Sequence, residues 1–222
     1  MTRKLVIFDW DGTVMDTVPK IVNTIRKVAI AHGLEPISDE ASKSIIGLSL
    51  EKAMATLFPE QQDNSADLAL TYKRLYKEDT TPAVVFTGVE ALLAALKNDG
   101  YLLAVATGKS RVGLDNLLAQ SGLRGYFNIT KTADDANSKP DPDMLQQILR
   151  ELDISPEQAI MIGDTAIDMQ LAKNANVPAV AVTLGAASAA QLEKYAPLAV
   201  CESYAQLQAF LLPEHVNAEF CQ

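Results

Sequence analysis

The sequence predicts an α/β fold in which a parallel sheet forms the core and a helical unit is inserted near its start. Four short apolar runs each end in a polar turn, at residues 4–8, 102–106, 159–162 and 179–182. The later runs follow helical stretches, and strands that alternate with helices form βαβ units whose parallel sheet is covered on both faces. At 222 residues and 48% hydrophobic composition, the chain can bury such a core and a smaller second unit.

The first apolar run leads directly into two acids. Residues 4–8 stop at Asp9, and Asp11 and Gly12 follow. If strand geometry persists, both carboxylates point the same way, about 6 to 7 Å apart, and Gly12 permits a sharp turn. A solvated Asp-Gly turn is the common alternative. The apolar strand argues against it, because it carries both acids to the carboxyl edge of the sheet, where open α/β sheets bind ligands.

The segment 15–85 is expected to be helical, because apolar residues recur there at helical spacing. A shorter helix is expected around 38–46. The three main apolar stripes are Ile21, Ile25, Val28 and Ala29; Leu50, Ala53, Met54 and Leu57; and Leu68, Tyr72, Leu75 and Tyr76. We therefore expect an α/β core at 1–14 and 86–213, a helical subdomain at 15–85 and a C-terminal tail at 214–222.

The turn after the second apolar run offers groups that suit a phosphate. Thr107 and Gly108 follow the run, and Ser110 is placed to cap the next helix. A hydroxyl and free backbone N–H groups at a helix start can bind an anion. Thr and Gly at a strand-to-helix turn are about as often structural, so this signal is weak when taken alone.

Lys139 is expected on a rigid support. Pro140 biases it toward an extended backbone, and Asp141 can cap a helix whose first position is Pro142. A solvated lysine is the default for this residue type. The rigid frame supports a functional role as an equal alternative to this default.

The third apolar run adds further acids to the same edge. Asp164 and Asp168 follow Gly163, and their four-residue spacing places them on one face of a helix that begins there. Thr165 with Asp168 also matches a capping box, which explains Asp168 as a helix-start residue. Asp164 has no such structural explanation.

These polar groups converge on one rim of the predicted sheet. Four carboxylates with a single lysine require a divalent cation to balance their charge. Oxygen ligands without His or Cys favour a hard ion, and Mg²⁺ with its retained waters suits a phosphate substrate.

Charge and composition exclude several other classes of function. The net charge of -9 opposes binding to nucleic acid or to an anionic membrane. Cys201, Cys221, His32 and His215 are too few for a disulfide framework or a zinc cage, so a reducing cytosol is the expected setting. The first apolar run ends at Asp9, too early for a signal peptide or a membrane span. The expected partner is a small phosphorylated metabolite, and the sequence does not indicate an oligomeric state.

Taken together, the motifs resemble those of the haloacid dehalogenase (HAD) superfamily. The string Phe-Asp-Trp-Asp-Gly-Thr at 8–13 resembles its first signature, Thr107 the second, 139–142 the third and 163–168 the fourth. The four occur in the family's order, across nearly the whole chain. The helical segment between the first and second motifs resembles the cap of the phosphoglycolate-phosphatase-like branch. The resemblance implies a Rossmann-like core with an inserted helical cap.

The resemblance also implies a mechanism. Asp9 would be the nucleophile that forms an aspartyl-phosphate. Asp11 would protonate the leaving alcohol and then deprotonate the attacking water. Thr107 and Lys139 would hold the phosphoryl oxygens. An acid at position 11 favours a phosphate ester over the dehalogenase and phosphonate-cleaving branches.

In this resemblance, Mg²⁺ would be bound by Asp9, Asp164 and the backbone carbonyl of Asp11. Asp168 would act on the water shell of the metal or on Lys139. A sugar-phosphate mutase would keep the same motifs and return the phosphate to its substrate, with cap groups such as Lys73 and Arg74 binding the sugar. A non-catalytic phosphate- or metal-binding regulator is disfavoured, because every expected catalytic position is retained.

One loop of the helical segment is a candidate for choosing the leaving group. Gly47, Leu48 and Ser49 lie where the helical pattern breaks, and Ser49 is placed to cap the following helix. The loop would offer backbone N–H groups and a hydroxyl to the substrate. A plain turn that faces solvent is the alternative.

Overall fold

The computed structural model describes residues 4–213, so the tail expected at 214–222 lies outside the described residues. The core is a six-stranded parallel sheet in the order β5-β4-β1-β6-β7-β8. Its strands are β1 (Leu5–Phe8), β4 (Leu102–Ala106), β5 (Ile129–Lys131), β6 (Ala159–Gly163), β7 (Ala179–Val182) and β8 (Val200–Cys201).

The predicted α/β class with a parallel sheet is confirmed. All four apolar runs form strands, and they supply β1, β4, β6 and β7. The sequence reading missed the two edge strands, β5 and β8. These have three and two residues, which is too short for a period to be recognised.

Helices cover both faces of the sheet because the strand residues alternate between two hydrophobic cores. Val6 and Phe8 lie on one face of the sheet, which is covered by α5 (Val89–Asn98), α6 (Arg111–Ser121) and α10 (Tyr204–Leu211). Leu5 and Ile7 contact the other face, packed by α7 (Asp143–Leu152) and α8 (Ala166–Asn174). A residue that follows β1 in the same register as Ile7 therefore points toward α7 and α8. The remaining core elements are α9 (Ala189–Leu192) and the 3₁₀ turns Leu123–Tyr126, Pro156–Gln158 and Glu193–Tyr195.

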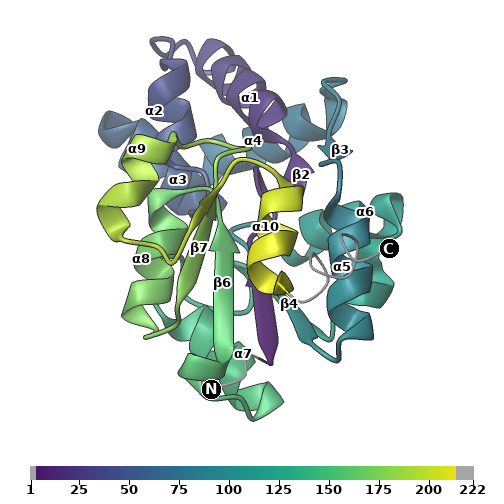
Figure 1. Cartoon of the computed structure of the whole chain (residues 1–222). Coiled ribbons are helices and arrows are strands. Elements are labelled where there is room, and N and C mark those ends of the chain that lie inside the picture. Colours follow the sequence, from purple (N-terminus) through teal and green to yellow (C-terminus); the bar gives the residue numbers. More distant parts are fainter. Residues whose placement is uncertain (1–3, 214–222) are drawn as a thin grey trace.

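A helical insertion separates β1 from β4. It consists of α1 (Val18–Ala31), α2 (Asp39–Ser44), α3 (Leu50–Leu57), the 3₁₀ turn Pro59–Asn64 and α4 (Ser65–Glu78). The antiparallel strands β2 (Met15–Asp16) and β3 (Val84–Val85) join it to the core. The helices pack on a hydrophobic cluster of their own, in which Ile25 and Met54 are fully buried. In Figure 1 these helices gather at the end of the sheet toward which β6 points.

The strand order creates a switch point at β1. The chain passes from β1 outward to β4 and β5, and then crosses to the other side of β1 to form β6, β7 and β8. In open α/β sheets, ligands bind at the carboxyl edge beside such a reversal. The helical insertion lies over this edge (Figure 1). Between residues 4 and 213, no helix is long and apolar enough to cross a membrane.

Candidate active site

Asp9, Lys139 and Asp168 form a buried ion-paired cluster at the carboxyl edge. The Lys139 ammonium donates to Asp9 Oδ1 at 2.7 Å and to Asp168 Oδ1 at 2.8 Å, and all three side chains are almost fully buried. Asp9 shares the register of Ile7, so it lies on the side of the sheet from which the segment before α7 supplies Lys139 and α8 supplies Asp168. The register of a single strand thus directs Asp9 to its partners.

The local support of Lys139 differs slightly from the expectation. Helix α7 begins at Asp143, and Pro142 occupies the N-cap position, whereas Pro142 was expected as the first helical residue. Asp141 Oδ1 accepts a hydrogen bond from the Asp143 backbone N–H at 3.0 Å. Asp141 therefore satisfies a free N–H of the first turn, from one residue earlier than the N-cap position. The peptide bond between Lys139 and Pro140 is cis.

Asp168 performs the structural role and also contacts Lys139. The expected capping box with Thr165 is present: the Thr165 hydroxyl donates to Asp168 Oδ2 at 2.6 Å and accepts from the Asp168 backbone N–H at 3.2 Å. This arrangement occupies Oδ2 and leaves Oδ1 for Lys139. The start of helix α8 thus fixes the orientation of a carboxylate that in turn holds the lysine.

Asp164 is held by two groups that the sequence reading did not assign. The Thr13 hydroxyl donates to Asp164 Oδ1 at 3.0 Å, and the Ala186 backbone N–H donates to Oδ2 at 2.7 Å. A Cβ on Gly12 or Gly185 would collide with this carboxylate, so both positions require glycine. Thr13 lies within the first motif, and its place there was the only sequence signal for this contact.

The three buried carboxylates fit a cation. Oxygen atoms of Asp9, Asp164 and Asp168 lie within 4.8 Å of one another, and Lys139 contacts Asp9 and Asp168 but not Asp164. Burial raises the pKa of Asp9 to about 7 even though Lys139 opposes the shift, and burial and the other acids raise the pKa of Asp164 well above its usual range. The buried Asp9 Oδ2 has no hydrogen-bond partner within the described part of the chain. One lysine does not balance this charge, and an orphaned carboxylate oxygen is a ready ligand for a hard ion.

Asp11 has different partners from Asp9. The condition that strand geometry persists is not met, because β1 ends at Phe8. The Lys109 ammonium lies 2.8 Å from Asp11 Oδ1, and the Thr17 hydroxyl donates to the same oxygen. Lys109 and Thr17 were not recognised in the sequence as site residues. Burial alone would lower the pKa of Lys109, but Asp11 raises it above its ordinary value.

The segment after β4 brings Thr107 and Gly108 to the same edge. Thr107 is buried, and its Oγ1 accepts a hydrogen bond from the Lys109 backbone N–H at 3.3 Å. Ser110 caps α6 as expected, since its hydroxyl accepts from the Gly113 backbone N–H. A Cβ on Gly108 would collide with the carbonyl oxygens of residues 47–48. This glycine is therefore required by the contact between core and insertion, which is a different reason from phosphate binding.

The loop of Gly47, Leu48 and Ser49 lies against the core. The Ser49 backbone N–H donates to the hydroxyl of Ser138 at 2.9 Å, directly beside Lys139 in the sequence. Gly47 is buried, and Leu48 and Ser49 are half-buried. Ser49 is the N-cap residue of α3, as expected from its position. Its side chain makes no capping hydrogen bond, so the prediction that its hydroxyl caps the helix is wrong. That the loop contacts substrate stays a prediction.

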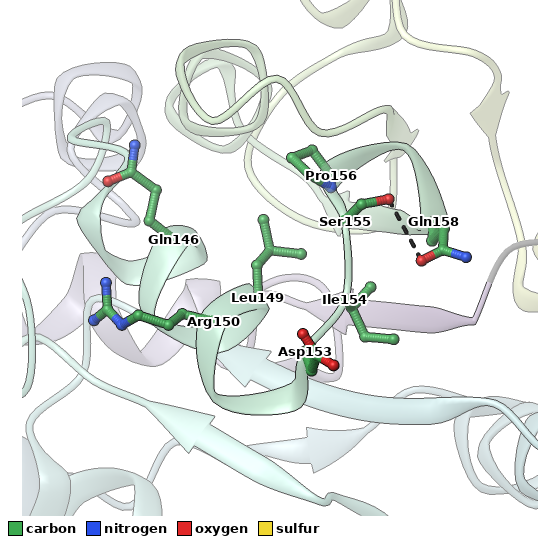
Figure 2. A pocket seen from close by; sticks show the side chains of 8 residues that line it. All are labelled: Gln146, Leu149, Arg150, Asp153, Ile154, Ser155, Pro156 and Gln158. Atoms are coloured by element: carbon green, nitrogen blue, oxygen red, sulfur yellow. Dashed lines mark hydrogen bonds between the residues drawn. The ribbon is translucent and has the colours of Figure 1, made fainter.

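A separate surface pocket lies far from these residues. Figure 2 shows it between the end of α7 and the start of β6, lined by residues that include Leu149, Arg150 and Gln158. The volume of the pocket is about 540 Å³. Ser155 and Gln158 hydrogen bond to each other across its rim. Because β6 starts here and ends at Gly163, the pocket is at the opposite edge of the sheet from Asp9.

Comparison with known families agrees with this geometry. The family described as haloacid dehalogenase-like hydrolase matches residues 6–182, which is most of the chain. The chain belongs to this family. It is thus a HAD-family hydrolase, and the match runs from the strand before Asp9 through the segment that carries Asp164 and Asp168.

Individual relatives match along nearly the whole length. A Dickeya dadantii protein named "Probable phosphatase IndB" is 34% identical, with 92% of each chain covered. The Cupriavidus necator protein named phosphoglycolate phosphatase, plasmid, is 30% identical, with 94% of this chain and 93% of the relative covered. Among solved structures, a predicted phosphatase from Clostridium acetobutylicum has a TM-score of 0.85 at 26% identity, with 96% of this chain and all of the other covered.

Proposed function

We propose that this chain is a Mg²⁺-dependent phosphatase that hydrolyses a small phosphate monoester through an aspartyl-phosphate on Asp9. The observation that carries the proposal is the state of Asp9: one carboxylate oxygen is paired with Lys139, and the other is buried without a partner at the switch point of the sheet. Such an oxygen is available to a metal ion and to a phosphorus atom. Two relatives are named as phosphatases, and this supports the same reaction.

The first chemical step uses the two acids after β1. A carboxylate oxygen of Asp9 bonds to phosphorus while the bond from phosphorus to the leaving oxygen breaks. Asp11 gives its proton to that leaving oxygen, and later takes a proton from the water that hydrolyses the aspartyl-phosphate. Asp11 is suited to this exchange because its side chain retains 11% exposure, whereas that of Asp9 retains 1%.

The phosphoryl oxygens would be held by Thr107, Gly108 and Lys139. Their fixed hydrogen-bond donors would offset the negative charge that develops on the transferring group. When bound, Mg²⁺ would be held by Asp9, Asp164 and the backbone carbonyl of Asp11, and would supply further positive charge to the phosphate. Asp168 would act through Lys139, which it orients.

The helical insertion would serve as a cap. Its loop of Gly47, Leu48 and Ser49 packs beside Gly108 and Ser138, so we propose that this loop faces the leaving group and excludes water from the site. The relative named phosphoglycolate phosphatase supports a small carboxylated phosphate as the substrate. We further propose a cytoplasmic location, from the low cysteine content.

Hydrolysis of a generic aryl phosphate tests the proposal. After treatment with chelator, phosphate release should be lost, and it should return when Mg²⁺ is added. Calcium should compete without restoring the rate, because it takes more ligands at longer distances and misplaces the nucleophile. Full activity in chelator would contradict the metal assignment. Release of inorganic phosphate, as opposed to an isomerised sugar phosphate, separates the hydrolase from a mutase.

A further inference from the structure

The region beside Asp11 carries more positive charge than the proposed mechanism uses. Lys109, from the turn after β4, pairs with Asp11 and keeps 12% of its side chain exposed. Lys20, from α1, donates to the backbone carbonyl of Asp79 at 2.9 Å, and no carboxylate pairs with it between residues 4 and 213. Lys27 pairs with the Asp79 carboxylate at 2.6 Å, so three lysines and two acids gather in this region and one positive charge is in excess.

Tyr76 of α4 joins Lys109 and Lys20. The Lys109 and Lys20 ammonium groups lie 5.2 and 4.8 Å from the centroid of its ring, within the range of a cation–π interaction. Tyr72 stacks on the same ring, with centroids 5.7 Å apart, and so restricts its orientation. The Tyr76 hydroxyl is buried and has no hydrogen bond of good geometry to another described residue, and it interacts electrostatically with the Lys109 ammonium.

A buried hydroxyl without a partner costs stability unless a ligand or water satisfies it. Here the hydroxyl belongs to a side chain that also contacts a partly exposed ammonium group, that of Lys109. A donor hydroxyl next to surplus positive charge is complementary to an anionic oxygen. The region therefore has the chemistry of a small anion site, in addition to the carboxylate cluster around Asp9.

The position of this region relates it to the leaving group. Asp11 protonates the leaving oxygen in the proposed reaction, so a residue that contacts Asp11 lies next to the leaving alcohol. Thr17 and Lys109 both contact Asp11, and Lys109, at 2.8 Å, is the one that carries a positive charge. Lys139, in contrast, is committed to two buried carboxylates on the phosphoryl side. A substituent on the alcohol would meet Lys109 before any other cation of the site.

We propose that Lys109, assisted by the Tyr76 hydroxyl and by Lys20, binds an anionic group carried by the leaving alcohol. The inference deepens the proposed phosphatase function and rests on it. It assigns Lys109 as the residue that recognises a second anion, a carboxylate or a phosphate, on the alcohol of the proposed monoester substrate. Lys109 acts as a specificity-determining residue, and the ion pair with Asp11 is the arrangement it adopts without substrate.

A matched pair of substrates tests this assignment. Phosphoglycolate and 2-hydroxyethyl phosphate differ in a carboxylate, and the wild-type protein should prefer the former in kcat/KM by about tenfold or more. Lys109→Met should reduce that preference by about tenfold, mainly through KM. Lys109→Arg should retain most of it.

Two further variants separate recognition from other effects. Tyr76→Phe removes only the hydroxyl and should reduce the preference by about two- to fivefold. Lys194→Met removes an exposed positive charge of the core and should leave the preference unchanged. Melting curves check that each variant is folded.

The possible failures are distinguishable. If Lys109 only positions Asp11, Lys109→Met should lower the activity on both substrates by the same factor. That result would overturn the recognition role. A wild-type protein that hydrolyses both substrates at the same rate would overturn it as well. If neither these substrates nor an aryl phosphate is hydrolysed, the proposed phosphatase function fails, and the recognition role fails with it.

Discussion

The two sides of the site differ in how completely their polar groups are paired. On the sheet side, Lys139, Asp164 and Asp168 are fully buried, and each makes at least two hydrogen bonds to other parts of the core. On the insertion side, Lys109 is partly exposed, and the hydroxyl of Tyr76 has no partner among the described residues. The sheet side is therefore fully paired except for Asp9 Oδ2, the oxygen proposed to take part in the reaction, whereas the insertion side holds a partly exposed lysine and a hydroxyl without a partner.

This difference follows from how each side is built. Parallel strands that end at one edge hold the sheet-side groups on a rigid support, and such preorganised groups stabilise developing charge effectively. The insertion packs on a hydrophobic cluster of its own and meets the core through contacts such as that of Ser49 with Ser138. We therefore expect changes on the sheet side to affect every substrate, and changes on the insertion side to affect the choice among substrates.

The largest effect is expected from Asp9→Asn. The amide is nearly isosteric but a poor nucleophile, so turnover should fall by about a thousandfold or more for all substrates while the fold is retained. Phosphate release at saturating Mg²⁺ measures the loss. Asp63→Asn, at an exposed position of the insertion, is the matched control and should behave as wild type. Activity within tenfold of wild type for Asp9→Asn would rule out the covalent mechanism.

Lys139→Met tests the sheet side through its effect on the free energy of unfolding. Removing the lysine leaves two buried carboxylates uncompensated, so the free energy of unfolding of the metal-free protein should fall by about 3 to 5 kcal/mol. Denaturant unfolding measures it.

The pH dependence of this loss has a defined sign. Burial raises the pKa of Asp9 in the folded protein, so the folded state gains a proton before the unfolded state does as the pH falls. Protonation removes the buried charge, and the destabilisation of Lys139→Met should therefore be smaller at pH 5 than at pH 8. If Lys139→Met lowers the free energy of unfolding equally at pH 5 and pH 8, the buried negative charge of Asp9 and Asp168 is not the cause of the destabilisation.

Leu48→Arg tests the insertion side. A long cation in a loop that faces the leaving group should change the ranking of substrates and lower kcat/KM by about ten- to a hundredfold, or roughly 1.4 to 2.7 kcal/mol. A panel of phosphorylated metabolites measures the ranking. An unchanged profile in a folded variant would place the loop outside the substrate site, and Lys73 and Arg74 would become the next candidates.

The smallest effect is expected from Arg26→Met, in an ion pair of the insertion that is not part of the site. Arg26 and Asp39 are 2.8 Å apart, and their side chains are 48% and 62% exposed. Solvent screens such a pair, so the free energy of unfolding should change by less than about 1 kcal/mol. The same denaturant experiment as for Lys139→Met checks it. If Arg26→Met lowered the free energy of unfolding as much as Lys139→Met does, burial would not explain the difference between the two ion pairs.

The sequence by itself determined most of the architecture. Apolar runs that stop at polar turns identify strands without any tertiary information, and the helical period predicted helices in the segment that separates β1 from β4. Parallel strands end at a common edge, so the sequence alone could also predict that Asp9, Thr107 and Asp164 would lie near one another. The capping box of Thr165 and Asp168 was also predictable from the sequence, because its two residues are only three positions apart.

Only the tertiary structure decided which group each side chain meets. Asp9 and Lys139 are 130 positions apart, and Thr13 and Asp164 are 151 positions apart, so no local pattern records their hydrogen bonds. The contacts of Lys109 depend on how the insertion packs over the sheet, since Asp11 comes from the core and Tyr76 from α4. A sequence period reports which face of an element is buried, but the partner across that interface is set by the packing of distant segments.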